Sequence, residues 1–145
     1  KRSPVVLTER RDHLEYLQKR FSRFVRNLVV LRGGMSAAER KISEAVLRVP
    51  DDQERLILAT GRYIGEGFDD QRLDTLFLTM PISWKGTLAQ YVGRLHRQHH
   101  RKTEVLVVDY VDEMVPVLAR MAAKRRMGYR SLGYAVESAS TINVS

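Results

Sequence analysis

The chain has 145 residues, and 43% of them are hydrophobic. That length suggests a single domain with a core of its own, and that composition excludes an intrinsically disordered chain. The absence of cysteine excludes disulfide scaffolds and thiolate metal sites. Because no apolar run approaches the roughly 18 residues of a membrane span and no signal peptide opens the sequence, we expect a cytoplasmic protein with no membrane partner.

The charge is strongly basic. The sequence carries 25 Lys and Arg residues against 17 Asp and Glu residues, for a formal net charge of +8. A surface of this kind prefers polyanions, with nucleic acid and nucleotide phosphates first. The alternative is a soluble domain whose arginine content reflects genome composition, and charge alone leaves both open.

Five short apolar runs predict β-strands. They are continuous rather than alternating, which is typical of parallel strands covered on both faces. Helical patterns separate most of them, so the sequence predicts an α/β fold with three layers, a mainly parallel sheet and helices on both faces. The runs are 5–7, 28–31, 56–59, 75–78 and 105–108.

Two amphipathic helices are predicted in the first half of the chain. One begins at about Arg11, and the other follows Ser36, a candidate N-cap with Glu39 at the capping-box position. The predicted apolar faces are Leu14, Leu17, Phe21, Phe24 and Val25 in the first helix, and Ile42, Ala45, Val46 and Val49 in the second.

A last helix is predicted near the end of the chain, with Asp112 as its candidate cap and Pro116 in its first turn. Residues 128–134 suggest an extension that docks on the domain or on a neighbour. We expect the domain to span residues 4–136, followed by a flexible polar tail over 137–145. Because the chain opens almost directly on a strand, we expect a domain cut from a larger protein. The apolar residues of the last helix are Val117, Leu118, Met121 and Ala122.

The segment WKGTLAQYVGRLHR, residues 84–97, predicts a helix with two chemically different faces. At about 100° per residue, an apolar face docks on the sheet and an amide with two guanidiniums lies opposite. Guanidinium forks suit phosphate oxygens, although a solvated basic face is the commoner case. The apolar face comprises Leu88, Tyr91, Val92 and Leu95, and the polar face comprises Gln90, Arg94 and Arg97.

A glycine-rich loop, residues 58–69, follows the third predicted strand. In open parallel sheets, ligands bind outside the carboxyl ends of the strands. Three glycines with a Thr and an Asp suit the approach of phosphate and a contact with sugar. The alternative for this loop by itself is a glycine-rich turn.

Taken in order, these segments resemble the motifs of superfamily 2 helicases. ATGRYIGEGFD is similar to motif V, and QYVGRLHR is similar to motif VI, with its pattern of Gln, two residues, Gly-Arg, two residues and Arg. VVLTER resembles the motif IV strand, and VVLRGGMSAAERK resembles the strand, turn and helix after it. The resemblance covers residues 4–110. It implies a second, C-terminal RecA-like domain, P-loop NTPase-like but lacking the P-loop itself, from a DNA helicase of the restriction-enzyme or DNA-repair type.

The resemblance also implies a set of roles at an ATP site. Arg94 and Arg97 would be catalytic, with Arg97 at the arginine-finger position, and Gln90 would support the same cleft. Motif V would contribute the remaining ATP-binding residues, with the last two near the ribose. These are Gly65, Gly67 and Asp69.

The same resemblance implies a nucleic-acid-binding surface for DNA, as a single strand or a duplex. Its residues come from motif IV, from the turn and helix after it, and from the start of motif V. They are Thr8, Arg10, Gly34, Arg40, Thr60 and Gly61.

Two departures argue against the DEAD-box RNA helicases. Glu66 stands where many relatives have Arg, and Ala37 stands where the DEAD-box group has Gln. No Lys directly follows a Gly, so the chain has no P-loop. We therefore expect ATP with Mg²⁺ to be bound mainly by a missing N-terminal RecA-like domain, and the domain alone to be monomeric and inactive.

One segment imitates a Walker B strand. Asp109 ends an apolar run, but it follows motif VI in the chain, so we interpret it as a strand-end residue. The cluster of His96, His99 and His100 makes a poor zinc site, and no metal ligands are predicted. Two other functions stay open: a nucleic-acid-binding module with a degenerate RecA-like fold and no catalysis, and a small nucleotide-binding enzyme complete in itself.

Overall fold

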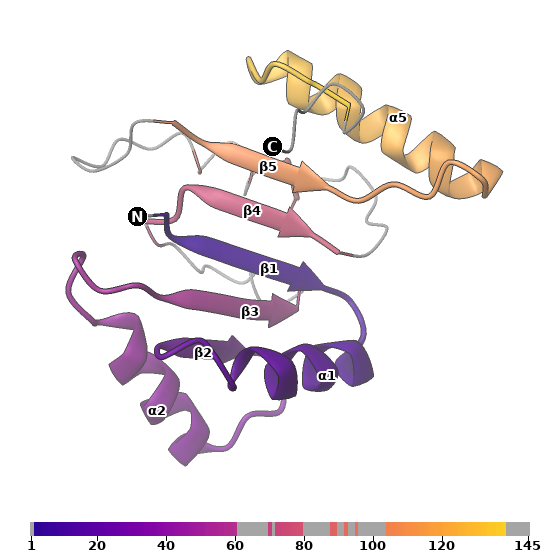
Figure 1. Cartoon of the computed structure of the whole chain (residues 1–145). Helices are drawn as coiled ribbons and strands as arrows, with labels where there is room; N and C mark the ends of the chain where they lie inside the picture. The colour runs from indigo at the N-terminus through magenta and orange to yellow at the C-terminus, as the bar shows by residue number, and fades with distance from the viewer. Residues whose placement is uncertain are drawn as a thin grey trace.

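A computed structural model gives the architecture of the domain (Figure 1). Among the residues that it describes, five parallel strands form one sheet in the order β2-β3-β1-β4-β5. The predicted α/β class and the five predicted strands are confirmed. The strands are β1 (Pro4–Thr8), β2 (Leu28–Leu31), β3 (Leu56–Thr60), β4 (Thr75–Leu78) and β5 (Leu106–Asp109). The described residues are 2–60, 70, 72–79, 88–89, 92, 95 and 104–138.

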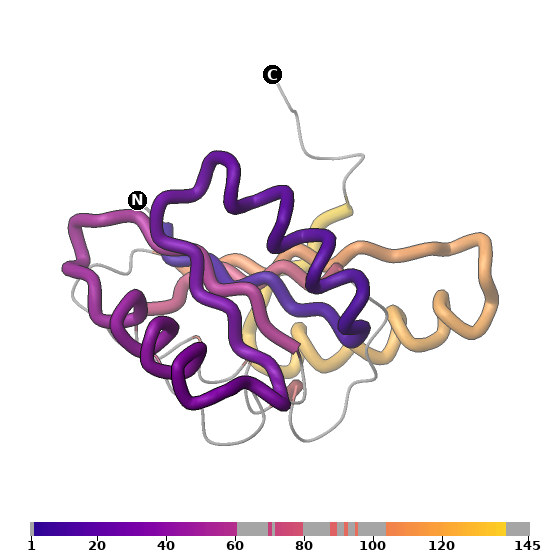
Figure 2. Tube along the Cα trace, turned by 90° about the horizontal axis from the view of Figure 1, so that it is seen from below, coloured from indigo at the N-terminus to yellow at the C-terminus, as the bar shows by residue number. Residues whose placement is uncertain are grey.

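Helices cover both faces of the sheet, as the three-layer prediction requires. The described helices are α1 (Arg11–Phe21), α2 (Ala37–Leu47) and α5 (Pro116–Ser131). Viewed along the sheet, α1 lies over one face, while α2 and α5 lie over the other (Figure 2).

The core has two parts because β1 is central and buried on both sides. Val5 and Leu7 point to the side of α2 and α5, and Val6 points to the side of α1. Successive strand side chains face opposite ways, so a strand buried on both sides must be apolar at every position. On the α1 side, Leu14 and Leu58 complete the cluster around Val6.

The predicted apolar face of α1 extends too far. Leu14 is fully buried, and Leu17 and Phe21 pack against the core. The helix ends at Phe21, however, and Phe24 is 71% exposed. A turn follows in which the Phe24 N–H donates to Phe21 O at 3.1 Å, and this turn carries Phe24 away from the sheet.

The α2 capping box is confirmed, and Val46 of the predicted buried face packs against the core, but Ile42 of that face does not. The Glu39 N–H donates to Ser36 Oγ at 3.1 Å, and the Ser36 N–H donates to Glu39 Oε2 at 3.0 Å. Ile42 is exposed, whereas Ser43 is buried and its hydroxyl donates to Val30 O at 3.0 Å. The helix is therefore rotated so that a small hydroxyl side chain, and not Ile42, approaches the backbone of β2.

The start of α5 also differs from the prediction. Pro116 lies in the first turn as expected, but Val115 is the N-cap, and it makes no side-chain capping bond. Asp112 instead accepts from the Met114 N–H at 3.1 Å, within the preceding turn. Val117 is exposed. The buried residues of α5 are Ala122, Arg125, Gly128 and Tyr129.

A buried ion pair fastens α5 to the end of β5. Arg125 donates from Nε to Asp109 Oδ2 at 2.8 Å and from Nη2 to Asp109 Oδ1 at 3.0 Å. The Tyr129 hydroxyl donates to the same carboxylate at 2.8 Å. Burial, and then the Asp109 charge, raise the pKa of Tyr129. Asp109 does end a strand, as predicted, and it also anchors a helix, which the sequence interpretation missed.

The segment after α5 docks on its own domain. The Tyr134 hydroxyl donates to Val92 O at 2.9 Å, and Tyr134 and Val136 pack against the main core. Burial raises the pKa of Tyr134 to about 12. Residues 128–134 were predicted to dock on the domain or on a neighbour, and the structure shows contacts with the domain itself.

Replacing the Asp109 carboxylate should destabilise the domain. Asp109→Asn leaves the Arg125 guanidinium, whose side chain is 1% exposed, without its charged partner. Loss of one partner of a buried pair costs about 3 kcal/mol or more. Urea unfolding should therefore show a much lower unfolding free energy for Asp109→Asn. Asp112→Asn, which changes an exposed carboxylate three residues later, should leave the unfolding free energy almost unchanged. Equal stabilities of the two variants would contradict the anchoring role.

Two neighbouring glycines give a matched test of backbone strain in the β2–α2 turn. Gly34 has φ +75°, which side chains with a Cβ rarely adopt, whereas a Cβ on Gly33 would meet no atom within 4 Å. Gly34→Ala should lower the unfolding free energy by about 1 kcal/mol, and Gly33→Ala should leave it almost unchanged. Thermal denaturation of both variants measures the difference, and a stable Gly34→Ala would show that the turn tolerates other conformations.

Candidate functional site

The parallel sheet gathers the candidate site at one edge. All five strands point the same way, so their carboxyl ends meet at the edge marked by the arrowheads in Figure 1. Thr8 and Thr60 are register partners at the ends of β1 and β3, and Leu31 at the end of β2 pairs with Ala59. The loops after three adjacent strands therefore begin side by side, where open α/β sheets bind ligands.

Thr8, predicted to contact nucleic acid, is buried at the end of β1. It is fully buried, and its Oγ lies 2.8 Å from His13 Nδ1 in a hydrogen bond. In this position the Thr8 hydroxyl orients the half-exposed His13 ring. We expect a contact at this strand end to come from His13, which sequence reasoning missed. The usable signal was a histidine in the first turn of the helix that follows motif IV.

Arg10 lies at the surface, where β1 gives way to α1. It is the N-cap residue of α1, and its guanidinium pairs with Asp12 at 2.8 Å. A hydrogen bond from the His13 backbone N–H lowers the pKa of Asp12. Both partners are about two-thirds exposed, so solvent screens the attraction between them and the pair is weak. Arg10 can therefore leave Asp12 for a phosphate at little cost.

The β2–α2 turn presents Gly34 and Arg40 to solvent. Glu39 belongs to the capping box, so the N-terminus of α2 already holds a carboxylate. Arg32 lies 3.8 Å from Glu39 and donates to Gly33 O at 3.2 Å, which braces the turn. Arg40 is exposed on the helix just beyond this turn. A strand passing over the carboxyl edge would meet Arg40 rather than the capped helix end.

The third contribution to the edge is Thr60, half-buried at the end of β3. With Arg10, Gly34 and Arg40, it forms the described part of the predicted nucleic-acid surface. The other predicted site residues lie outside the described residues, so their roles stay predictions. They are Gly61, Gly65, Gly67, Asp69, Gln90, Arg94 and Arg97.

The helix predicted over residues 84–97 can be checked on its apolar side. Leu88, Val92 and Leu95 are all buried in the main core cluster, as the periodicity predicts. Tyr91, the fourth residue of that face, lies outside the described residues. The buried side supports the amphipathic interpretation, while the polar side stays a prediction.

The described part of the chain was searched for a metal site and for a membrane-spanning helix. In it, no three His, Asp or Glu side chains gather into a group that could hold a metal ion. No helix there has the length and apolar character needed to cross a membrane.

Two viral proteins are similar to this chain in sequence, although no family model matches it. The chain is 31% identical over 83 residues to the uncharacterized protein 108L of Invertebrate iridescent virus 3, a match that covers 57% of the chain and 75% of that protein. It is 26% identical over 104 residues to transcript termination protein A18 of Yaba-like disease virus, covering 72% of the chain and 21% of A18. The chain thus spans about a fifth of A18.

Solved structures with the same fold include part of an ATPase domain and a domain of a DEAD-box protein. The C-terminal part of the Fun30 ATPase domain matches 99% of the chain with a TM-score of 0.62 at 11% identity, over 43% of its own length. T4 UvsW matches 90% with a TM-score of 0.67 at 16% identity, over 29% of its length. The C-terminal domain of the DEAD-box protein Dbp5 matches 90% with a TM-score of 0.64 at 12% identity, over 70% of its length.

These identities show a shared fold rather than a shared substrate. The 31% match covers three quarters of protein 108L, which is enough to define a family. The chain therefore belongs to the family of protein 108L, and it shares the RecA-like α/β fold of the C-terminal part of the Fun30 ATPase domain and of the C-terminal domain of Dbp5.

Proposed function

We propose that this chain is the C-terminal motor domain of an ATP-dependent DNA helicase or translocase. It would supply motifs IV, V and VI to an ATP site shared with an N-terminal RecA-like domain that carries the P-loop. The observation that supports the proposal is the carboxyl edge, where the loops after β2, β3 and β1 begin side by side.

The proposed chemistry needs two domains. ATP and Mg²⁺ would be held mainly by the P-loop domain, and Gly65, Gly67, Asp69 and Gln90 would complete the cleft from this side. Arg94 and Arg97 would stabilise the charge that develops on the γ-phosphate during transfer, which is the work of arginine fingers. Closing and opening of this cleft would move the carboxyl edge along a strand.

We further propose DNA as the nucleic acid and a restriction-enzyme or DNA-repair type of motor. Support comes from the two departures from the DEAD-box pattern, Glu66 and Ala37. The competing function, a binding module without catalysis, would share the basic surface and the fold. Loss of ATP turnover through a single arginine distinguishes the two.

Arg97→Ala should abolish DNA-stimulated ATP hydrolysis in the longer protein that joins this chain to its P-loop domain. Arginine fingers contribute on the order of 10³ to 10⁵ in rate. Arg97→Lys should restore little, because a point charge cannot replace the planar fork, and Arg94→Ala should behave like Arg97→Ala. Steady-state turnover with and without single-stranded DNA measures the effect.

Two controls accompany this experiment. Lys124→Ala removes an exposed charge from α5 and should leave turnover unchanged. The 145-residue chain alone should hydrolyse no ATP, because it lacks a P-loop. Near-normal turnover by Arg97→Ala would refute the finger assignment, and turnover by the chain alone would favour a complete small nucleotide-binding enzyme.

The carboxyl edge should bind single-stranded DNA without sequence preference. The double variant Arg10→Gln/Arg40→Gln should lower the salt dependence of binding by about 1.4 log units per log unit of salt, at about 0.7 for each lost phosphate contact. Fluorescence anisotropy at several salt concentrations gives this slope. Arg120→Gln/Lys124→Gln removes the same charge from exposed positions of α5 and should leave the slope unchanged; equal slopes for both double variants would contradict the proposed surface.

A further inference from the structure

A second basic surface lies on the outer side of α1 and in the turn after it. Residues 19–26, KRFSRFVR, carry four cations and no carboxylate. The acidic residues of α1 both lie in its first half, where Asp12 pairs with Arg10 and Glu15 lies 3.4 Å from Arg11. Because α1 runs back across the sheet from the end of β1, its last turn lies far from the carboxyl edge (Figures 1 and 2).

Phe24 is an aromatic ring held in place but open to solvent. Its ring contacts Phe21 edge to face, with centroids 5.8 Å apart, and Phe21 packs against the core cluster around Val6. The Val25 N–H donates to Phe21 O at 2.8 Å, which fixes the turn. A ring anchored in this way loses little conformational freedom when a flat partner stacks on it.

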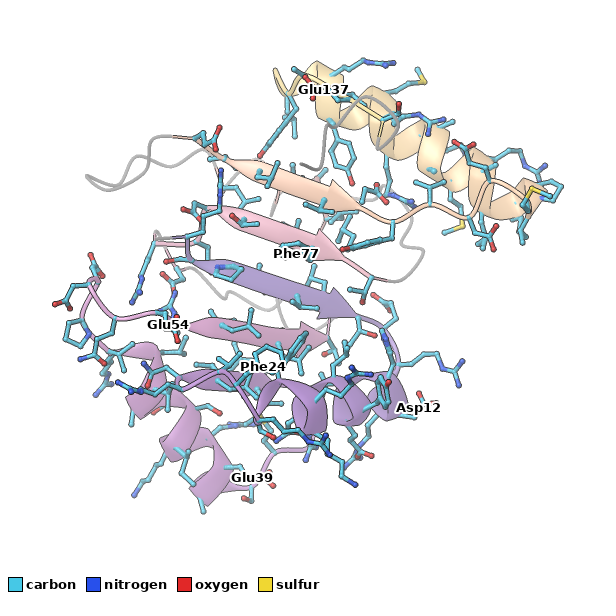
Figure 3. The ribbon with its side chains drawn as sticks, in the orientation of Figure 1. Asp12, Phe24, Glu39, Glu54, Phe77 and Glu137 are labelled. Carbon is cyan, nitrogen blue, oxygen red and sulfur yellow. The ribbon has the colours of Figure 1, made fainter. Side chains whose placement is uncertain are left out.

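Cations and a second aromatic ring surround this position. Arg20 donates to the Tyr16 hydroxyl at 2.8 Å, and its guanidinium carbon lies 5.7 Å from the centre of the Tyr16 ring. Tyr16 is 54% exposed, and Arg23 and Arg26 are exposed on either side of Phe24. Figure 3 labels Phe24 on this side of the molecule.

We propose that this surface is a second contact for single-stranded nucleic acid, separate from the carboxyl edge. A base stacks on Phe24, and Arg23 and Arg26 neutralise the phosphates on either side of it. Exposed rings interleaved with cations are the means by which proteins hold single strands without reading sequence. We call this surface the α1 patch and define it as Tyr16, Arg20, Arg23, Phe24 and Arg26.

Charge complementarity selects nucleic acid over a lipid surface. A helix that lies on a membrane needs a broad apolar face to insert into the acyl boundary. The apolar residues of α1, Leu14, Leu17 and Phe21, already pack against the sheet. Phe24 stands among charged neighbours, an arrangement that suits one base and its phosphates. The inference rests on the proposed function only for the chemical class of the partner.

Substitutions at Phe24 test the stacking. Phe24→Leu keeps an apolar side chain but removes the aromatic face, and it should weaken binding of a labelled single-stranded oligonucleotide by about tenfold. Phe24→Trp restores a larger face and should bind at least as tightly as the wild type. Met127→Ala, a change at another exposed apolar side chain, should have no effect. A Phe24→Leu variant that binds like the wild type would overturn the stacking role.

The arginines are tested through salt dependence. Arg23→Gln/Arg26→Gln should reduce the slope of log affinity against log salt by about 1.4, and Arg120→Gln/Lys124→Gln should not change it. All of these positions are exposed, so melting temperatures should match the wild type. An unchanged slope for Arg23→Gln/Arg26→Gln would overturn the phosphate contacts.

Comparison with the carboxyl-edge variant separates the two proposals. If Arg10→Gln/Arg40→Gln weakens binding and the α1-patch variants do not, the α1 patch is refuted and the proposed function stands. If only the α1-patch variants weaken it, the α1 patch stands and the carboxyl-edge path fails. Vesicles with a high content of phosphatidylserine provide the third comparison. If Phe24→Leu weakens binding to these vesicles and leaves binding to the oligonucleotide unchanged, the proposal is overturned in favour of a membrane.

Discussion

The whole domain depends on the burial of β1 on both faces at the centre of the sheet. Val5, Val6, Leu7 and Thr8 are each at most 5% exposed, and each fully buried aliphatic side chain contributes about 1.5–3 kcal/mol through the hydrophobic effect. Such a strand must have neighbours on both sides and helices on both faces. In this sheet β3 and β4 are those neighbours, and because all the strands are parallel, the strand ends that carry the candidate site lie at one edge.

The two edges of the sheet differ in chemistry. At the amino edge, the side chains are committed to structure: Asp74 accepts from the Ser3 N–H at 2.8 Å, Arg72 donates to Ser3 Oγ at 2.8 Å, and Arg55 pairs with Asp70 at 2.6 Å. At the carboxyl edge, Arg10 and Arg40 remain exposed. Fixed polar partners hold the amino edge and, at the carboxyl edge, the end of β5 through Asp109, whereas Arg10 and Arg40 beyond β1 and β2 are exposed cations that can bind a ligand. The α1 patch adds a basic surface outside both edges.

Patterns that depend on local chemistry could be predicted from the sequence, and patterns that depend on tertiary contacts could not. The capping box of Ser36 and Glu39, the five strands, and the buried face of Leu88, Val92 and Leu95 all follow from periodicity and hydrogen-bonding groups. Phe24 and Ile42 are exposed because the helix ends early in one case and is rotated in the other. Thr8 was expected to contact nucleic acid, and its burial with a hydrogen bond to His13 could not be predicted from the sequence. The Asp109 anchor joins residues sixteen and twenty positions apart, and only the small residues Ala122 and Gly128 beside Arg125 and Tyr129 hinted at a buried face.

The central claim is that nucleic acid binds at the carboxyl edge, and backbone amide chemical shifts measure this most directly. Titration of the isotopically labelled chain with a short single-stranded DNA should move the amide signals of Arg10, Gly34 and Thr60 together, along one saturating curve. Signals of Ser3, Leu56 and Thr75 at the amino edge should stay in place. Shifts confined to the amino edge, or none at the carboxyl edge at saturation, would contradict the account.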